Sequence, residues 1–510
     1  MDSIRLIFFL VISFSFAASK TAEEWRTRSM YQIITDRFAR SDRDTTPCAD
    51  LGKYCGGTWK GIENNLDYIQ GMGFNAIWIS PVQQNIEGGY HGYWYSDFYK
   101  FNEHFGTEQD FRDLVKACHE RDIWVMVDIV ANHVGYVQEN IKDTTTNDYS
   151  KSVPFDKPEY YHPFEQTCID ARKYDPDNDT ALETCWLAYL PDLNQSHPYV
   201  RQTLLEWVNW FIKTYEIDGL RLDAIMHVPL DFWVEFEKAS KVFCVGEAFD
   251  ERVAFNAKFQ KAVGSMLNFP LNARLYWSFV RNETMTHFAK YYTEAFNTWP
   301  DITVLANFMN NHDIARFLSQ NNDYEMFKTA IGFTMTSIGI PAIYYGDEQA
   351  FKGGDDPQNR ETLWGHMNTD SELYKYIKSL NDFRRKTNLA ALDQIERNYD
   401  DELYSFTRGD YFFAFTHSNE DIKRIIDNHP YKENTVLCNY LTQEQCTKVQ
   451  GGKFELFIER KKMKILVPKE MQENSFEETK IQDRIQNLVS NAARDLSNVY
   501  ISETSLASFI

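Results

Sequence analysis

Short runs of hydrophobic residues alternate with longer amphipathic stretches along most of the chain. The runs are rich in β-branched and aromatic residues, as expected of strands, and the clearest stretch between them, Pro198–Tyr215, places its apolar residues on one helical face. Strands that alternate with helices are typical of β-α units around a parallel sheet. The pattern predicts an α/β fold, a closed (β/α)8 TIM barrel, with strands at Met30–Ile34, Phe74–Ser80, Ile123–Val130, Ile217–Asp223, Lys241–Glu247, Ser265–Phe269, Thr303–Phe308 and Pro341–Gly346.

Three parts of the chain depart from this alternation. The stretch 132–192 is rich in Asp, Tyr, Pro and Thr and is too long for a simple βα loop, so we expect an inserted subdomain after the third strand. From 392 to 468 the pattern becomes strand-like, which predicts a C-terminal antiparallel β-sandwich domain. Residues 20–131 and 193–391 then form the barrel, and 469–510 is a polar tail to which no role is assigned.

Residues 1–19 have the features of a secretory signal peptide, because Arg5 is followed by the apolar run LIFFLVISFSF and then by small residues. This run is too short to span a bilayer. We expect the mature chain to begin near Lys20 and to be exported, either out of the cell or into a digestive vacuole. The formal net charge of -21 argues against nucleic acid and against an anionic membrane as partners.

Export makes disulfides the first interpretation of the eight cysteines. Cys118 lies in a helical pattern and Cys244 in an apolar strand, and we expect both to be buried free thiols. The other six form three pairs of near neighbours in the sequence, which predicts the disulfides Cys48–Cys55, Cys168–Cys185 and Cys438–Cys446. Glycosylation sequons, which suit an exported protein, occur at Asn178, Asn194 and Asn282.

Three carboxylates follow predicted strands at their carboxyl ends, where the loops of a barrel converge. Asp223 closes GLRLD, Glu247 closes FCVGE, and Asp313 follows FMNNH. Alternation within GLRLD places Arg221 and Asp223 on the face that points into the barrel, and the two leucines on the face that packs against helices. We therefore expect the charged side chains of this segment to reach the barrel mouth.

This pattern of charges suits an acid and a nucleophile that act on a glycoside. Arg221 should lower the pKa of Asp223 and keep it ionised, whereas neighbouring carboxylates should raise the pKa of Glu247 so that it keeps a proton. Two such groups about 5 Å apart hydrolyse a glycoside with retention of configuration. His133 and His312 lie at equivalent strand ends; zinc ligation is the alternative for them, disfavoured because the sequence has no HExxH-like spacing.

Four segments in this order resemble the signature motifs of the α-amylase family of glycoside hydrolases. They are DIVANH (Asp128–His133), GLRLDAIMH (Gly219–His227), CVGEAFD (Cys244–Asp250) and NNHDIARF (Asn310–Phe317), and LPDLN (Leu190–Asn194) is similar to a fifth. The resemblance runs from about Met30 to Pro468. Within the family, the segments CGGTW, YHGYW and DDPQNRETLW are most similar to those of fungal-type secreted α-amylases.

The resemblance implies a role for each matching residue. Asp223 matches the nucleophile, Glu247 the general acid/base, and Asp313 the carboxylate that stabilises the distorted sugar. Tyr93 matches the aromatic platform under the reacting ring, and Trp94 lies beside it, where packing of the cleft wall is an equally good interpretation of Trp94. The residues that match substrate-binding positions are Tyr93, Trp94, His133, Arg221, His227, His312, Asp356 and Arg360.

A bound Ca2+ follows from the same resemblance and suits a set of oxygen ligands. The matching ligands are Asn132, Glu183, Asp192 and His227, with Glu183 and His227 contributing backbone carbonyls. Three of them belong to the insertion or its edges, and His227 follows the segment that carries Asp223. We expect the ion to clamp the insertion onto this segment.

Two residues depart from the family pattern. Met226 stands where the fungal-type motif has a lysine, so a polar contact to a glucose on the reducing side is lost. Asn194 makes LPDLN intermediate between the LPDLD of typical α-amylases and the QPDLN of oligosaccharide-cleaving relatives. We therefore expect short malto-oligosaccharides to be cleaved well.

The resemblance as a whole implies a secreted, calcium-dependent α-amylase that acts as a monomer. Its substrate would be an α-glucan polysaccharide or oligosaccharide, cleaved within the chain at α-1,4 bonds with retention of configuration. An α-glucosidase or a transglycosylase with the same machinery is the nearest alternative. A non-catalytic sugar-binding homologue is disfavoured, because all three acids are present.

Overall fold

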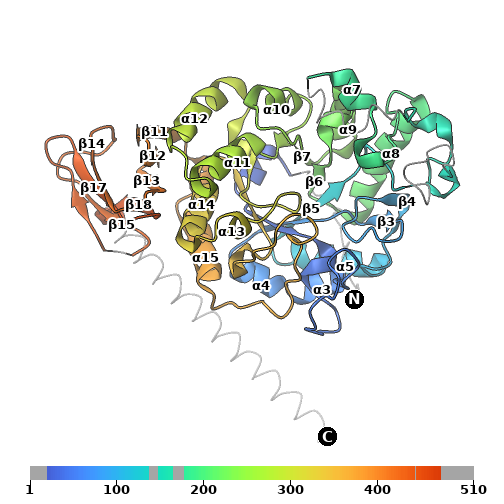
Figure 1. Cartoon of the computed structure of the whole chain (residues 1–510), viewed down its shortest axis with the longest axis horizontal. Coiled ribbons are helices and arrows are strands. Elements are labelled where there is room, and N and C mark those ends of the chain that lie inside the picture. Colours follow the sequence, from blue (N-terminus) through green and yellow to red (C-terminus); the bar gives the residue numbers. More distant parts are fainter. Residues whose placement is uncertain (1–19, 137–147, 165–176, 443, 472–510) are drawn as a thin grey trace, which may run out of the picture.

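Eight parallel strands form the central sheet of the computed structural model, which describes residues 20–136, 148–164, 177–442 and 444–471 (Figure 1). Their order is β8-β7-β6-β5-β2-β1-β10-β9. A parallel bridge between Leu267 and Ala306 joins the two outer strands and closes the predicted barrel. The strands are β1 (Met30–Ile33), β2 (Ala76–Ile79), β5 (Trp124–Ile129), β6 (Gly219–Leu222), β7 (Phe243–Gly246), β8 (Ser265–Met266), β9 (Ala306–Asn307) and β10 (Ile340–Tyr344).

All eight predicted strands are present, but β8 and β9 are shorter than the sequence pattern suggests. Residues Ile302–Val304, which include the first two residues of the strand predicted at Thr303–Phe308, form a single 3-10 turn, because the Asp301 side chain accepts a hydrogen bond from the Thr303 backbone N–H. The seam between the two short strands is reinforced by a hydrogen bond of 2.8 Å from the Asn268 side chain to Asn307.

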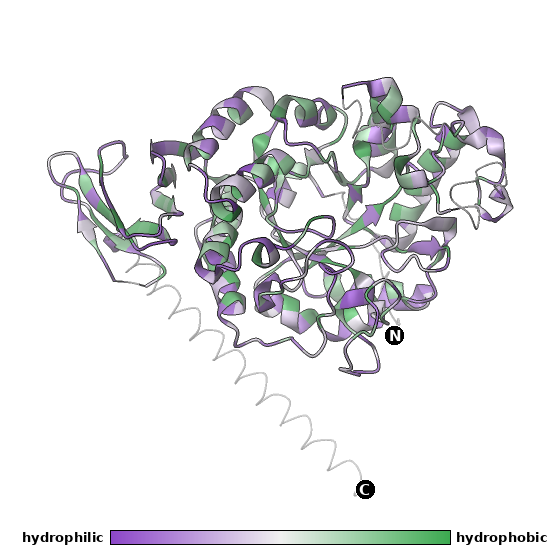
Figure 2. Ribbon diagram, in the orientation of Figure 1, coloured by the Kyte–Doolittle hydropathy of each residue, from purple (hydrophilic) through white to green (hydrophobic). Residues whose placement is uncertain are grey.

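Helices cover the outside of the barrel, and hydrophobic and hydrophilic residues alternate along them (Figures 1 and 2). The longest, α8, occupies the predicted range Pro198–Tyr215 and ends where Glu216 adopts a left-handed conformation, with φ 56°. The other helices are α1 (Ala22–Arg26), α2 (Thr35–Phe38), α3 (Trp59–Asn64), α4 (Leu66–Gly71), α5 (Glu108–His119), α7 (Asp179–Thr184), α9 (Leu230–Ser240), α10 (Val253–Gln260), α11 (Phe269–Leu275), α12 (Thr286–Thr298), α13 (Phe317–Gln320), α14 (Tyr324–Thr336) and α15 (Glu372–Lys386).

Two separate hydrophobic clusters show how strand alternation sorts the side chains. Leu220 and Leu222 of β6 belong to the cluster between the strands and the outer helices, as predicted. The inner cluster is closed at one end by Trp25 of α1, which packs on Trp124 and Phe243. Gly219 lies directly beneath Trp25, and a Cβ there would come within 2.7 Å of the indole.

An antiparallel hairpin that the sequence pattern did not reveal connects the barrel to the insertion. It consists of β3 (Gln83–Asn85) and β4 (Tyr95–Phe101) and follows β2. Val153 of the insertion bridges Asp97 of β4, and His133 and Asp192, at the two ends of the insertion, bridge each other. The insertion therefore begins and ends at one place, beside the carboxyl end of β5.

The predicted C-terminal domain is a sandwich of two antiparallel sheets of unequal size. A six-stranded sheet has the order β11-β12-β13-β18-β15-β16, and a two-stranded sheet contains β14 and β17. Residues such as Phe412, Leu437 and Phe454 fill the space between them. The strands are β11 (Gln394–Tyr399), β12 (Leu403–Arg408), β13 (Tyr411–Thr416), β14 (Ile422–Ile426), β15 (Val436–Asn439), β16 (Thr447–Lys448), β17 (Phe454–Ile458) and β18 (Met463–Pro468).

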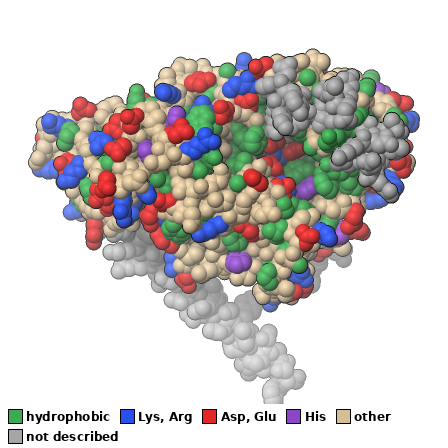
Figure 3. Space-filling view, viewed as in Figure 1, with side chains coloured by type: hydrophobic (Ala, Val, Ile, Leu, Met, Phe, Trp, Pro, Cys, Tyr) green, Lys and Arg blue, Asp and Glu red, His purple; other side chains and the backbone are tan. Residues whose placement is uncertain are grey.

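Two of the three predicted disulfides are present, Cys48–Cys55 and Cys438–Cys446. Cys185 is also disulfide-bonded, but its predicted partner Cys168 lies outside the described residues, as does the predicted signal peptide. Cys118 and Cys244 are buried free thiols, as predicted. None of the helices described is long and apolar enough to cross a membrane. Acidic and basic side chains are interspersed over the face in Figure 3, and hydrophobic side chains gather in a hollow near its middle.

One buried arginine joins the C-terminal domain to the barrel. Arg408, at the end of β12, is 1% exposed. Its guanidinium donates to the carbonyls of Thr336 and Ser337, at the end of α14, and to those of Leu389 and Leu392, at distances of 2.7 to 3.1 Å. Burial lowers the pKa of Arg408 to about 9. These bonds satisfy carbonyls that the end of α14 would otherwise leave unpaired.

We expect Arg408→Met to lower the free energy of unfolding by about 3 kcal/mol, because it leaves several buried carbonyls without donors. Urea denaturation followed by tryptophan fluorescence measures this change. Lys423→Met is the control, because the Lys423 side chain is 67% exposed and contacts Glu455 at the surface. Equal stability of the two variants would contradict the role assigned to Arg408.

Candidate active site

Strand register brings a buried aspartate and a buried arginine together at the carboxyl end of the barrel. Asp128 of β5 pairs with Arg221 of β6 in the parallel register. Arg221 Nη1 lies 2.9 Å from Asp128 Oδ1 and 2.6 Å from Asp223 Oδ1, and neither Arg221 nor Asp128 is exposed. Asp128 also accepts hydrogen bonds from Trp78 Nε1 and from the Tyr93 hydroxyl.

The third carboxylate of this group, Glu247, follows β7. Its Oε1 lies 3.1 Å from Arg221 Nη2, although this nitrogen makes no hydrogen bond. Its Oε2 accepts a hydrogen bond of 3.0 Å from the Ala224 backbone N–H. Ala224 adopts a left-handed conformation with φ 50°, which turns its N–H toward Glu247. One guanidinium therefore holds Asp223 firmly and approaches Glu247 from the same side.

Asp313 lies across the site and is 33% exposed. It is 3.1 Å from His312 Nε2, and the ring of His312 stacks on that of Tyr93 at 5.2 Å. The Tyr93 hydroxyl is 2.7 Å from His312 Nε2, and Gln32 Nε2 is 2.8 Å from His312 Nδ1. Because the Tyr93 hydroxyl donates to Asp128, these contacts are all satisfied when His312 carries its proton on Nε2.

A second arginine, Arg360, stands on the Asp313 side of the cleft. Its Nη2 is 3.5 Å from Asp313, and its Nη1 is 2.9 Å from Asp356 and donates to the Tyr90 hydroxyl. The Arg360 side chain is 6% exposed, whereas that of Asp356 is 52% exposed. The structure thus brings the predicted pair Asp356 and Arg360 next to the third acid.

The pKa of Asp223 moves in the direction opposite to the one that the sequence suggested. Burial raises it well above its ordinary value, and the negative charges of Glu247 and Asp128 add to this effect. Arg221 opposes the rise, but it shares its single charge with three carboxylates. Burial also raises the pKa of Asp128, to about 6. Arg221 does act to lower the pKa of Asp223, as predicted, but burial outweighs it, so the expected net lowering was wrong.

The two predicted histidines are buried and neutral at physiological pH. Burial lowers the pKa of His133 to about 4 and that of His312 well below its ordinary value. His133 Nε2 is 3.2 Å from the Tyr93 carbonyl. Trp94 is half-buried and packs against His91 and Tyr136. These contacts suit either of the roles proposed for Trp94.

Three of the predicted calcium ligands come together where the insertion meets the barrel. The Asn132 side-chain oxygen faces Asp192 Oδ1 at 3.1 Å and the His227 carbonyl oxygen at 2.9 Å, so that three acceptors face one another. A rotated Asn132 amide would instead donate to both of these oxygens. Convergent oxygens of this kind suit a hard cation. Among the described residues, no group of three His, Cys, Asp or Glu could hold a metal ion.

The other predicted residues near this cluster are placed by α7. Glu183 is half-buried on this helix. His227 Nδ1 lies 3.0 Å from the carbonyl of Leu182, the residue before Glu183. This contact joins the His227 ring to the insertion, and His227 is 3% exposed.

The two residues that depart from the family pattern, Met226 and Asn194, lie in different surroundings. Met226 is also 3% exposed and packs in the core. Asn194 is half-buried, and its side chain accepts a hydrogen bond from the Ser196 backbone N–H.

Several residues of the site were not predicted. Asp128 opens the motif DIVANH, and its position at the end of a wholly apolar strand was the available signal. Gln32, Trp78 and Tyr90 come from segments far apart in the sequence, so only the closed barrel brings them to Asp128, His312 and Arg360. No local pattern could have identified Gln32.

The chain is similar to known proteins in both sequence and fold. Residues 32–388 match a family model described as alpha amylase, catalytic domain. An α-amylase of Saccharomycopsis fibuligera is 35% identical over 88% of this chain and 94% of its own. α-Amylase 2 of Schizosaccharomyces pombe is 38% identical over 75% of this chain, and the matched part is 66% of that protein. For α-amylase 1 of Lipomyces kononenkoae, the matched part is 59% of that protein. The chain thus spans less than two thirds of these last two relatives.

Solved structures give the same result. An α-amylase from Malbranchea cinnamomea superposes with a TM-score of 0.82 and 34% identity, covering 88% of this chain and 98% of that one. An α-amylase from Geobacillus thermoleovorans, complexed with acarbose, gives a TM-score of 0.75 and 30% identity, covering 87% and 98%. From the family match and these relatives, the chain belongs to the α-amylase family of glycoside hydrolases.

Proposed function

We propose that this protein is an α-amylase that hydrolyses α-1,4 bonds within starch, glycogen and malto-oligosaccharides. The observation that carries this proposal is the single buried guanidinium of Arg221. It binds Asp223 at 2.6 Å and lies 3.1 Å from Glu247, so two carboxyl groups of different loops face the same cleft. Relatives named α-amylase at 35% to 41% identity support the substrate class.

In the proposed reaction Asp223 attacks the anomeric carbon while Glu247 protonates the departing glycosidic oxygen. This gives a covalent glycosyl-enzyme, and Glu247 then takes a proton from the water that hydrolyses it. Two inversions at the same carbon leave the configuration retained. Asp313, which is partly exposed and faces the cleft beside His312, stabilises the positive charge that develops on the sugar ring.

The charges of the cluster favour this division of roles. One cation cannot neutralise three carboxylates, so one proton remains among them. Asp223 has the shorter contact with Arg221, and Asp128 is held by three donors, whereas the Arg221 nitrogen nearest to Glu247 makes no hydrogen bond with it. We therefore assign the attack to Asp223, which Arg221 holds in position, and the proton transfer to Glu247.

The remaining predicted residues position the substrate. We propose that Tyr93 supplies the ring beneath the reacting sugar, and that the neutral His133 and His312 bind its hydroxyl groups. Arg360 and Asp356, which contact each other beside Asp313, bind a neighbouring glucose. Arg221 contacts the sugar as well as the acids, and the His227 ring would have to leave Leu182 to do so.

A transglycosylase of the same family is the second candidate. A cyclomaltodextrin glucanotransferase superposes with a TM-score of 0.76 at 28% identity, and both reactions pass through the same glycosyl-enzyme. They differ in whether water or a sugar hydroxyl completes the reaction. The products formed from maltotetraose separate them, because transfer yields chains longer than the substrate.

We further propose export from the cytosol and a calcium ion at the insertion. The disulfides at Cys48–Cys55 and Cys438–Cys446 support an oxidising compartment. The facing oxygens of Asn132, Asp192 and His227 support the ion, with Glu183 as a further ligand. Bound there, the ion would fasten the insertion to the segment that follows Asp223. We expect a monomer.

Glu247→Gln should lower the turnover of soluble starch by about 10³-fold, because the amide cannot protonate the leaving oxygen. Reducing-sugar assays measure this loss, and proton NMR of the fresh product should show the α anomer for the wild type. Glu251→Gln, an exposed change in the same loop, is the control and should retain full activity. A β product, or normal turnover by Glu247→Gln, would contradict the proposed mechanism.

The pKa of Asp128 gives a prediction for stability against pH. The folded state holds this proton up to about pH 6, whereas an unfolded aspartate loses it near pH 3.9. The folded state therefore binds more protons in this window, so this contribution is full below pH 4 and is lost as the pH rises through 6. It amounts to about 3 kcal/mol.

Urea denaturation of the wild type and of Asp128→Asn from pH 4 to 7 tests this window. The variant has no carboxyl group at this position to titrate. We expect the stability of the wild type relative to the variant to fall between pH 4 and 6 and then to level off. A difference that stays constant over this range would contradict the assignment.

Calcium removal should destabilise the insertion and the cleft together. We expect excess EDTA to lower the melting temperature by several degrees and to abolish activity, and added Ca2+ to restore both. Asp192→Asn should show the low melting temperature in either condition. Asp156→Asn, an exposed change in the same insertion, is the control. An unchanged melting temperature of the wild type in EDTA would exclude a structural calcium ion.

A further inference from the structure

One row of side chains on the solvent side of α8 has an aromatic residue at each end of the row and two polar residues between them. Tyr199, Gln202, Glu206 and Trp210 are spaced by three or four residues, so they lie on one side of the helix. The first and last are separated by about 16 Å along the helix axis. Tyr199 is 43% exposed, and Gln202 and Glu206 are also exposed. This row is unlike the surface of a helix that only covers a barrel.

The rings of this face are held in place by other aromatic residues. Tyr199 stacks on Tyr160 with a centroid distance of 4.7 Å. Trp210 contacts Tyr99 of β4 at 5.3 Å and the edge of Tyr215 at 5.7 Å, and Tyr99 is itself 44% exposed. Rings braced in this way lose little conformational entropy when a ligand covers them.

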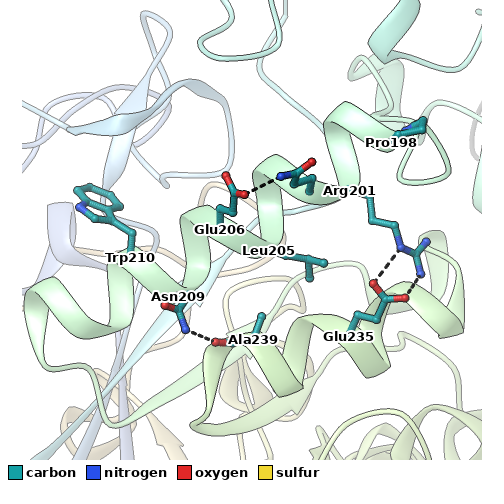
Figure 4. A pocket seen from close by; sticks show the side chains of 9 residues that line it. Pro198, Arg201, Leu205, Glu206, Asn209, Trp210, Glu235 and Ala239 are labelled. Carbon is teal, nitrogen blue, oxygen red and sulfur yellow. Dashed lines mark hydrogen bonds and ion pairs between the residues drawn. The ribbon is translucent and has the colours of Figure 1, made fainter.

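A groove of about 610 Å³ runs beside this row, between α8 and α9. Leu205 and Ala239 give it an apolar floor, and the Asn209 side chain bonds to the Ala239 carbonyl at 2.8 Å (Figure 4). Trp210 lies at one end of the groove, and the Gln202 amide donates to Glu206 at 2.8 Å. Aromatic rings, amides and carboxylates are therefore available within one surface.

The charges of this surface select the kind of ligand that it can bind. Its arginine, Arg201, is bound by Asp231 at 2.8 Å and by Glu235 at 3.0 Å, so its charge is already neutralised. Glu206 adds a negative charge, which disfavours phosphate, nucleic acid or an acidic protein segment. A neutral ligand that offers both apolar faces and hydroxyl groups matches the row best, because aromatic rings pack on the former and the amide and carboxylate bind the latter.

We propose that the row Tyr99, Tyr199, Gln202, Glu206 and Trp210, with the adjacent groove, is a second α-glucan-binding surface, distinct from the catalytic cleft. This inference rests on the proposed function, since the ligand is the polymer that the cleft cleaves. β4 connects the two places, because Tyr99 lies five residues, or about 17 Å of extended strand, beyond Trp94 at the cleft. A chain held on α8 would keep the enzyme close to an insoluble substrate.

Adsorption of the full chain to starch granules in the cold tests the proposal. The variants are Tyr199→Ala, Trp210→Ala and the double variant. The control is Tyr399→Ala, because Tyr399 is 50% exposed and lies on the C-terminal domain. We expect the double variant to adsorb at least about fivefold less than the wild type. Hydrolysis of maltotetraose should stay unchanged, because this short substrate needs only the cleft.

Unchanged adsorption of the double variant, or an equal loss for Tyr399→Ala, would overturn the proposal. If Trp210→Ala does not fold, the exposed changes Tyr199→Ser and Glu206→Lys decide the question with the same outcomes. Sedimentation velocity identifies the other possible occupant: a dimer that these variants dissociate, with adsorption intact, would make the surface a contact between two copies. Absence of maltotetraose hydrolysis in the wild type would count against the proposed function, whereas a loss of adsorption in the α8 variants with hydrolysis unchanged reports on α8.

Discussion

The buried guanidinium of Arg221 is the constraint on which the site depends. A charge inside the barrel costs several kcal/mol of lost hydration unless it is paired, and Arg221 is paired by Asp128 and Asp223 with no exposure to solvent. The strand register supplies Asp128, and strand alternation supplies Asp223 two residues on. Because both partners are set by the backbone of the sheet, Asp223, the proposed nucleophile, is held in a fixed position on the barrel.

The insertion is also positioned by the ends of the barrel strands. His133 and Asp192, near its two ends, bridge each other, so the segment leaves the barrel and returns at one point. Asn132 stands at that point and faces the carbonyl of His227, which follows the turn after Asp223. A cation bound there would link three segments that are distant in sequence. A change of charge among these ligands would therefore affect both the insertion and the cleft.

The sequence predicted what depends on local spacing and missed what depends on closure and burial. The strand pattern identified the barrel, and the helical face of Pro198–Tyr215 identified α8 with its correct bounds. The hairpin of β3 and β4 was missed because β3 has only three residues. The predicted pKa direction of Asp223 was wrong because burial outweighs the effect of Arg221, and the extent of burial is determined only by the folded barrel. Gln32 could not be assigned because its only functional contact is made across the closed sheet.

The Tyr93 hydroxyl joins the two halves of the site, since it contacts both Asp128 and His312. It has one proton, which goes to Asp128, so His312 must present an N–H to it and accept from Gln32 on the other ring nitrogen. A protonated His312 would turn a second N–H toward the Gln32 amide and break this chain of donors. The lowered pKa of His312 prevents that exchange. Asp313 contacts Nε2 of the same ring, so the hydrogen bonds that fix His312 also help to position Asp313.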